Sequence, residues 1–364
     1  MLADLDNVIS LGVGEPDFVT PWNVREAAIY SIERGHTMYT SNYGLIELRR
    51  EVAAYLRRLY GVEYDPAREI LITVGVSEGL DLAARATLNP GDEVIVPDPS
   101  YVSYAPCVVL AGGEVVPVPT YRENDFQVTA ADIAGKITPR ARAILIGFPN
   151  NPTGAVVDRD ELSRIARLAA DRDLLVYSDE IYSRLVYGVD HTCFSALPGA
   201  HERTVLLGGL SKSHAMTGWR VGFAAAPADI IEGMMKVHQY AVMCAPTAAQ
   251  MAAVEALRSG DEAVQEMVED YDRRRRVMVS GLNDLGLDCF EPRGAFYAFP
   301  SIRRTGLSSE QFAEQLLLEE KVAVVPGSAF GESGEGYVRC CYATSLSQIK
   351  EALARISRFV ARYG

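Results

Sequence analysis

Short apolar segments recur between residues 70 and 225, and most of them are separated by segments with the spacing of amphipathic helices. Each apolar segment covers only a few positions, and residues 204–207, for example, are short and β-branched enough to indicate a buried strand. The predicted strands are residues 70–74, 93–96, 114–118, 143–147, 174–177, 204–207 and 221–225. Strands that alternate with helices in this way form a mostly parallel sheet covered on both faces. The sequence therefore predicts an α/β fold in which a mostly parallel seven-stranded sheet is sandwiched by helices.

The chain is long enough for a second domain, since 364 residues exceed the usual size of one hydrophobic core. Residues 261–285 predict one long helix, and the basic cluster Arg273–Arg276 lies within it. Because several acidic residues flank the cluster, we interpret it as a solvated helix face and not as a nucleic-acid-binding patch. We place a domain boundary in this helix: residues 21–274 form a large domain, and residues 1–20 and 275–364 form a smaller α+β domain.

The composition argues against several classes of partner. The chain carries 35 Lys and Arg against 48 Asp and Glu, a net charge of −13, which disfavours nucleic acid and an anionic membrane surface. No apolar run is long enough to span a bilayer, and no signal peptide is evident. The six cysteines show neither a Cys-x-x-Cys pair nor the spacing of metal ligands. We therefore expect reduced thiols in a cytoplasmic protein, with no metal site.

One lysine stands directly after a predicted strand. Two glycines end the strand at residues 208 and 209, and Ser211 then precedes Lys212. A lysine at the end of a buried strand is costly to hold charged, because desolvation favours the neutral amine. A neutral amine is a nucleophile for an aldehyde, so we expect Schiff-base chemistry at Lys212. For this residue taken alone, a solvated loop lysine is the simpler interpretation.

Other chemically useful residues also lie at or after predicted strands. Ligands of such sheets bind beyond the carboxyl ends of the strands. Gly75, Val76 and Ser77 open a helix there, and free N–H groups at a helix start bind anions, although a plain capped helix is the alternative. A carboxylate buried at a strand end, as at Asp179, needs a cation or hydrogen-bond donors. Arg339 stands in an apolar strand without an evident acidic partner, so it should meet a carboxylate, with a structural salt bridge as the alternative.

Several stretches resemble motifs of the class I aminotransferases of fold type I, which use pyridoxal 5′-phosphate (PLP). Ala-Met-Thr-Gly-Trp-Arg at residues 215–220 is typical of their subgroup Iγ. Leu-Gly-Val-Gly-Glu-Pro-Asp-Phe at residues 11–18 and Asn-Pro-Thr-Gly at residues 151–154 are similar to motifs of the same subgroup. Residues 147–222 and 323–344 are especially similar to archaeal aromatic aminotransferases, and also to PatA-like aminotransferases. Relatives usually carry a further segment ahead of the opening motif, so we expect that segment to be missing here.

The resemblance implies a role for each of these residues. PLP would be attached to Lys212, and Asp179 would hold its ring nitrogen. Tyr182 and Asn151 would bind its phenolic oxygen, and Tyr101 would stack on its ring. Lys212, Asp179 and Tyr182 would be the catalytic residues. The phosphate ligands would be Gly75, Val76, Ser77, Ser211 and Arg220, joined by Tyr39 of a second subunit. The ligands of the substrate carboxylate would be Gly14, Asn151 and Arg339.

The activity implied by the resemblance is transfer of the amino group of an L-amino acid to 2-oxoglutarate, by a homodimer with shared active sites. No residue is an unambiguous cation for a distal substrate carboxylate, although Arg293 and His214 are candidates. The apolar and aromatic residues near the site favour aromatic or large neutral amino donors; they are Tyr101, Tyr297, Phe330 and Val13. An aspartate aminotransferase and a C–S β-lyase are the alternatives on the same scaffold, and a non-catalytic regulatory protein is a third.

Overall fold

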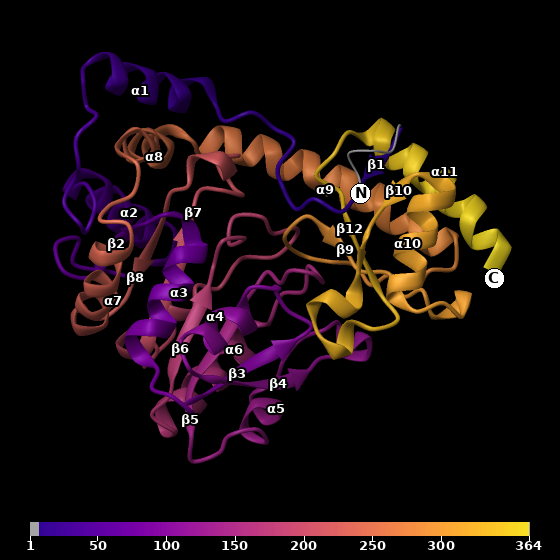
Figure 1. The fold of residues 1–364 in the computed structure, drawn as a ribbon, viewed down its shortest axis with the longest axis horizontal. Helices are drawn as coiled ribbons and strands as arrows, with labels where there is room; N and C mark the ends of the chain where they lie inside the picture. The colour runs from indigo at the N-terminus through magenta and orange to yellow at the C-terminus, as the bar shows by residue number, and fades with distance from the viewer. Residues whose placement is uncertain (1–6, 364) are drawn as a thin grey trace.

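Seven strands form one sheet in the computed structural model, which describes residues 7–363 (Figure 1). The strands are β2 (Ile70–Thr73), β3 (Glu93–Asp98), β4 (Glu114–Pro119), β5 (Ala141–Gly147), β6 (Leu175–Asp179), β7 (Thr204–Gly209) and β8 (Gly222–Ala225). Their order is β2-β8-β7-β6-β5-β3-β4. All neighbouring pairs are parallel except the two that β8 makes with β2 and β7. The predicted mostly parallel sheet is therefore confirmed.

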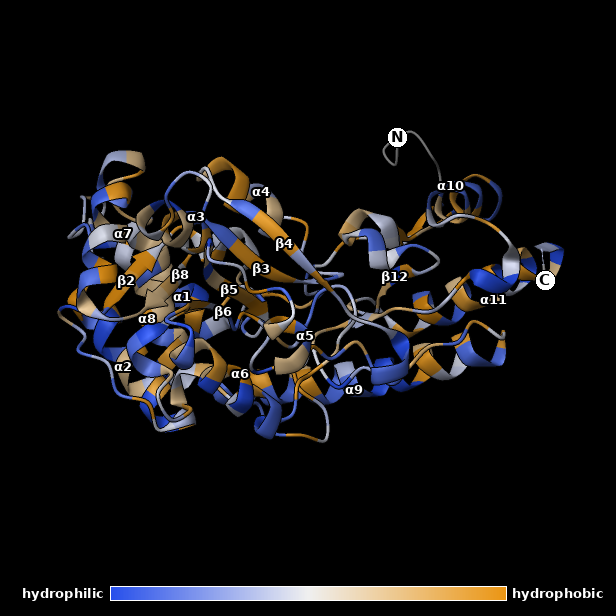
Figure 2. Ribbon diagram, turned by 90° about the horizontal axis from the view of Figure 1, so that it is seen from below, coloured by the Kyte–Doolittle hydropathy of each residue, from blue (hydrophilic) through white to orange (hydrophobic). Residues whose placement is uncertain are grey.

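All strands of this sheet except the edge strand β4 are largely buried on both faces, and strands of that kind appear in a sequence as continuous apolar runs. Along β5, Ile144 and Ile146 pack into one hydrophobic core, whereas Leu145 between them packs into another. This division follows from the alternation of side chains across a strand. Figure 2 shows β2 as largely hydrophobic, in agreement with its burial, whereas the edge strand β4 is only partly buried.

Helices cover the two faces of the sheet. On one face, α3 (Gly75–Thr87), α4 (Tyr104–Leu110) and α7 (Ala228–Ala241) share a core with the strands. On the other face, α5 (Ala130–Ala134) and α6 (Arg159–Asp171) do the same. Because α3 begins directly after β2, its amino-terminal turn lies close to the end of that strand.

Three further helices lie near the β2 end of the sheet. The helices α2 (Ile46–Tyr60) and α8 (Thr247–Ser259) share a third core with β2 and β8, and α1 (Trp22–Glu33) packs on α8. The short 3₁₀ helices within residues 7–363 are η2 (Arg122–Asn124), η3 (Phe194–Ala196), η4 (His201–Arg203), η5 (Thr217–Trp219), η6 (Arg303–Thr305), η7 (Gly327–Phe330) and η8 (Glu332–Gly334).

The C-terminal part of the chain, which we call the C-terminal unit, packs around a further core that also includes Tyr182, Leu185 and Tyr187 from the segment after β6. The long helix α9 (Asp261–Asp284) leads from the large sheet into it (Figure 1). Its other elements are β1 (Ile9–Ser10), β9 (Tyr297–Ala298), β10 (Val322–Ala323), β11 (Val325–Pro326), β12 (Val338–Cys341), α10 (Ser309–Glu320) and α11 (Leu346–Tyr363). Strands β11, β12 and β9 form an antiparallel sheet, and β1 pairs in parallel with β10. The division into residues 21–274 and the remainder stays a prediction, and its residues 1–6 lie outside the described residues.

The basic cluster on α9 is only partly solvated. The two middle arginines, Arg274 and Arg275, are buried, whereas the two outer ones are exposed. Nη1 of Arg274 lies 2.7 Å from Oδ1 of Asp17, which ties the amino-terminal segment to α9. The interpretation of the cluster as a solvated face is therefore wrong for its middle pair. Four consecutive residues span more than one face of a helix, so two of them turn inward.

Two findings concern the surface and the thiols. Within the described residues, no helix is long and apolar enough to cross a membrane. All six cysteines are free, and four of them are buried. Free thiols agree with the absence of paired spacings in the sequence.

Candidate active site

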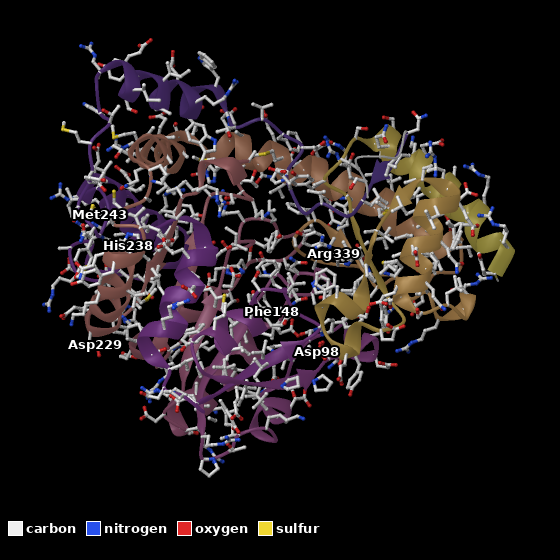
Figure 3. The ribbon with its side chains drawn as sticks, viewed as in Figure 1. Asp98, Phe148, Asp229, His238, Met243 and Arg339 are labelled. Atoms are coloured by element: carbon white, nitrogen blue, oxygen red, sulfur yellow. The ribbon has the colours of Figure 1, made fainter. Side chains whose placement is uncertain are left out.

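A cavity of about 440 Å³ lies between the large sheet and the C-terminal unit. Its walls on the sheet side come from residues at or after the ends of β2, β3, β5, β6 and β7, and Tyr297, Phe330 and Arg339 close it from the other side. Figure 3 shows Arg339 between these two parts of the molecule. All residues predicted to bind the cofactor or the substrate carboxylate, except Gly75 and Tyr39, line the cavity; they are Gly14, Val76, Ser77, Tyr101, Asn151, Asp179, Tyr182, Ser211, Lys212, Arg220 and Arg339.

Lys212 lies in the turn after β7, and its amine points into the cavity wall formed by the amino-terminal segment. Its Nζ donates a hydrogen bond of 2.7 Å to the carbonyl oxygen of Gly14. Burial lowers the pKa of Lys212, because desolvation disfavours the ammonium ion. The amine is therefore more easily deprotonated than an exposed lysine, as a nucleophile or proton carrier requires.

Asp179 ends β6 as a buried carboxylate. Oδ2 accepts a hydrogen bond of 2.9 Å from the hydroxyl of Tyr104, and Oδ1 accepts one of 3.1 Å from the amide of Ile181. Both bonds favour the ionised form, but desolvation is the larger effect and raises the pKa of Asp179 to about 6. Such a carboxylate is well suited to contact a cationic group of a ligand.

Arg339 projects from β12 and is buried without a carboxylate partner among the described residues. Nη1 donates to Oδ1 of Asn151 at 2.8 Å, and Nη2 donates to the carbonyl oxygen of Gly12 at 2.6 Å. Nε is buried and has no hydrogen-bond partner in the described part of the chain. The aromatic rings of Tyr297 and Phe330 lie 4.5 and 4.9 Å from the guanidinium carbon. Because the Arg339 guanidinium has no carboxylate partner and its Nε makes no hydrogen bond among the described residues, it can bind an incoming carboxylate.

A candidate anion site adjoins the amino terminus of α3. Val76 and Ser77 lie in the first turn of this helix, where backbone N–H groups have no partner within the helix. Gly75 adopts φ +77°, and a Cβ atom there would lie 2.6 Å from Nη2 of Arg220. Arg220 itself is held by a hydrogen bond of 2.7 Å from Nη1 to the carbonyl oxygen of Thr217. Helix amides, a guanidinium and the Ser77 hydroxyl together suit a phosphate group.

The remaining wall of the cavity is aromatic and hydroxylic. The hydroxyls of Tyr182 and Tyr297 lie 2.6 Å apart, and Tyr101 lines the same space. A buried amine, a buried carboxylate, an anion site and an aromatic wall converge here, which matches the aldehyde, ring nitrogen, phosphate and ring of PLP. The residues present therefore fit this cofactor.

Sequence reasoning missed Tyr104, which also lines the cavity and contacts Asp179 directly. Tyr104 follows Tyr101 by three residues and stands at the start of a helix, and this spacing is the sequence signal that could have placed both tyrosines at the same site. The two candidate cations for a distal carboxylate are not in the cavity. His214 is buried, and a Cβ atom on Gly260 would lie 2.6 Å from its ring; burial lowers its pKa to about 3. Arg293 is exposed and lines a separate hollow.

Two other predicted residues lie apart from the cavity. Val13 is 57% exposed and does not line it. Tyr39 is 80% exposed and lies outside the lining of the cavity in its own chain. A role for Tyr39 in the site of a second subunit stays a prediction.

Known proteins are similar to this chain in both sequence and fold. Residues 6–356 match a family model described as aminotransferase class I and II. The Bacillus subtilis protein YugH, which carries the name of an aminotransferase, is 55% identical over 360 residues, covering 99% of this chain and 93% of that protein. The aspartate aminotransferase of Pyrococcus abyssi is 46% identical over 359 residues, covering 98% of this chain and 92% of that protein. The crystal structure of an aromatic aminotransferase from Pyrococcus horikoshii has a TM-score of 0.97 at 45% identity, covering 100% of this chain and 99% of that one.

Proposed function

Because the chain belongs to the class I and II aminotransferase family, whose class I members use PLP, we propose that it moves the amino group of an aromatic or large neutral L-amino acid to 2-oxoglutarate. The observation that carries this donor preference is the charge of the cavity lining. Within the described residues, its cations are Lys212, Arg220 and Arg339. Each of them has a role in the proposal, so none is left for the second carboxylate of a dicarboxylic donor.

The aromatic wall supports the same preference. Tyr101, Tyr297 and Phe330 line the cavity and offer apolar surface to a donor side chain. Burying a phenyl ring contributes about 1.5–3 kcal/mol, and roughly one to two decades in kcat/KM when the gain persists in the transition state. A fixed arginine would instead be left unpaired by an aromatic donor, which is unfavourable. The second carboxylate of 2-oxoglutarate is proposed to reach the open mouth of the cavity and keep its hydration.

When bound, PLP supplies an electron sink for the negative charge left by removal of the substrate α-proton. The attachment point and the carrier of this proton would be Lys212, whose pKa burial lowers. Asp179 would keep a proton on the ring nitrogen of PLP, because the protonated nitrogen is a cation that the buried carboxylate can bind. Tyr182 and Asn151 would bind the phenolic oxygen, and Tyr101 would stack on the ring.

The rest of the lining would orient the two anionic groups. The proposed phosphate ligands are Gly75, Val76, Ser77, Ser211 and Arg220. The substrate carboxylate would contact Arg339, Asn151 and the backbone at Gly14. A carboxylate bound to Arg339 would satisfy its unpartnered Nε. Two-point contacts of this kind fix the orientation of the α-carbon relative to the amine of Lys212.

A homodimer is part of the proposal. Large apolar side chains remain exposed on the isolated chain: Met38 is 77% exposed, Tyr39 80% and Tyr240 88%. Burial of such side chains against a second copy would stabilise a dimer. Tyr39 would then reach the cofactor phosphate of the neighbouring subunit.

A panel of amino donors with 2-oxoglutarate as acceptor tests the function. Phenylalanine and tyrosine should give the highest kcat/KM, with leucine and methionine next and aspartate lower. Aspartate as the best donor, with phenylalanine and tyrosine unused, would show that the argument from the missing cation is wrong. That outcome would favour an aspartate aminotransferase, the name carried by the relative from Pyrococcus abyssi. Release of ammonia and pyruvate from a cysteine conjugate without any 2-oxo acid would indicate a β-lyase.

A further inference from the structure

Asp98 links the large sheet to the C-terminal unit. It is the last residue of β3, and its Oδ2 accepts hydrogen bonds from the amide (3.1 Å) and the hydroxyl (3.0 Å) of Ser333. A third hydrogen bond runs in parallel, from the amide of Ser100 to the carbonyl oxygen of Phe330 at 3.0 Å. Ser333 and Phe330, the partners in these hydrogen bonds, both belong to residues 327–334, which lie between β11 and β12. Figure 3 labels Asp98 where these two parts of the molecule meet.

The fit around this carboxylate is close. Gly331 adopts φ +132°, and a Cβ atom there would lie 1.6 Å from Oδ1 of Asp98. Oδ1 is buried and has no hydrogen-bond partner among the described residues. Burial raises the pKa of Asp98, as expected for a carboxyl group without a cation beside it. Such a group is a poor contributor to stability, which favours a role in positioning.

The segment that Asp98 holds also forms part of the candidate active site. Phe330 lines the cavity, and its ring lies 4.9 Å from the guanidinium carbon of Arg339. A shift of residues 327–334 away from β3 would therefore move the ring against which Arg339 rests. The contact at Asp98 is outside the cavity, so its effect on the site must pass through this segment.

We propose that Asp98 and Ser333 form a positioning contact that holds Phe330 against Arg339 and thereby tunes the affinity for the α-carboxylate of the substrate. This inference rests on the proposed function through the role of Arg339. Neither Asp98 nor Ser333 lines the cavity, so we assign both a positioning role and not a catalytic one. Their contribution should appear in the binding of carboxylates and not in the chemical step.

The test compares Ser333→Ala with Ser328→Ala in the PLP-loaded enzyme. Both serines are half-buried in the same segment, but the Ser328 hydroxyl has no hydrogen-bond partner within the described residues. Ser333→Ala should raise KM for the best donor of the panel about fivefold with kcat nearly unchanged, since hydrogen bonds to charged groups are among the stronger ones. The dissociation constant of 3-phenylpropionate, a carboxylate without an amino group, should rise by the same factor; succinate replaces it if aspartate is the best donor. Ser328→Ala should match the parent enzyme.

Two further variants decide whether the effect passes through Arg339. Arg339→Lys should raise KM by itself, and adding Ser333→Ala to it should change KM by less than about twofold, because coupled residues are not additive. A fully additive effect, or equal KM values for Ser333→Ala and Ser328→Ala, overturns the inference while the proposed function stands. If Arg339→Lys leaves KM unchanged, the carboxylate role of Arg339 fails, and the inference fails with it. Asp98→Asn, which keeps an acceptor oxygen, should retain more affinity than Asp98→Ala, and equal losses would also contradict the proposal.

Discussion

The hydroxyl of Tyr104 donates a hydrogen bond of 2.9 Å to Oδ2 of Asp179, and both side chains line the candidate active site. Tyr104 begins α4, and a Cβ atom on Gly147 would lie 2.0 Å from its hydroxyl oxygen. The glycine at the end of β5 thus leaves the space through which Tyr104 reaches the end of β6. Tyr104 is a positioning residue for the carboxylate that we propose to hold the ring nitrogen of PLP.

The first prediction concerns this hydrogen bond. Tyr104→Phe should lower kcat/KM about tenfold, because a hydrogen bond to a charged group contributes about 1.5–3 kcal/mol. The measurement is steady-state kinetics at saturating PLP, with cofactor retention checked by absorbance. Tyr177→Phe is the matched control, since it removes a buried hydroxyl that bonds Thr87 outside the cavity. Equal kinetics for the two variants would contradict the role of Tyr104.

A second prediction follows from the pKa of Asp179, which rises from 3.8 to about 6 in the folded, cofactor-free protein. A raised carboxyl pKa stabilises the fold below pH 3.8, and this contribution is lost as the pH rises through about 6. The free energy of unfolding of the parent protein should therefore fall relative to that of Asp179→Asn over this range. Two pKa units correspond to a total change on the order of 3 kcal/mol. Urea unfolding of both cofactor-free proteins across this range measures the difference, and parallel curves would contradict it.

Residues close to strand ends were predictable because a local signal marks them. Lys212 and Asp179 each adjoin an apolar run, and the parallel sheet brings such positions to one edge. The contact between Tyr104 and Asp179 was not predictable, because it depends on how α4 packs against a strand 75 residues further along the chain. For His214, in contrast, the position in the sequence suggests a place in the cavity that the structure does not give it. It stands two residues after Lys212, yet its side chain turns away from the cavity and packs beside Gly260.

A third prediction tests the attachment of the cofactor. Borohydride should fix PLP covalently to the parent protein, and peptide mapping should locate it at Lys212. Lys212→Ala should retain PLP without a covalent bond and lose turnover by several orders of magnitude, because the amine is both attachment point and proton carrier. Lys236→Ala is the control, since this lysine is 62% exposed and pairs with Glu232 on the surface. Covalent labelling of another lysine in Lys212→Ala would show that the assignment is wrong.

The fourth prediction concerns assembly. Light scattering should give twice the chain mass of 39.7 kDa for the active enzyme. Tyr39→Phe should weaken PLP retention modestly, because it removes one of several phosphate donors. Tyr121→Phe, at an exposed tyrosine that we assign to neither the cavity nor the dimer contact, should not change it. A fully active monomer would rule out a site shared between subunits.

The last prediction concerns Gly14, whose carbonyl oxygen accepts the hydrogen bond from Lys212 at 2.7 Å. A Cβ atom on Gly14 would lie 2.2 Å from the hydroxyl oxygen of Tyr297 and 3.1 Å from its ring carbon Cζ. Overpacking of this kind costs about 1–3 kcal/mol, so Gly14→Ala should lower kcat/KM roughly tenfold to a hundredfold as Tyr297 or the Lys212 loop shifts. Gly218→Ala is the matched control in the same region, because a Cβ atom there would meet no atom within 4 Å.

A second substitution, at Tyr297, relieves the expected clash with Gly14→Ala and so identifies the cause of the loss in kcat/KM. Tyr297→Phe removes the hydroxyl oxygen and leaves Cζ at 3.1 Å, a contact that a small shift of the ring accommodates. In that background, Gly14→Ala should therefore cost much less of kcat/KM than it does in the parent enzyme, even though Tyr297→Phe also removes the contact with Tyr182. An undiminished loss in the double variant would mean that the Gly14 backbone, and not its distance from Tyr297, requires glycine. Because Gly14 has no positive φ, the steric explanation is the one that the structure supports.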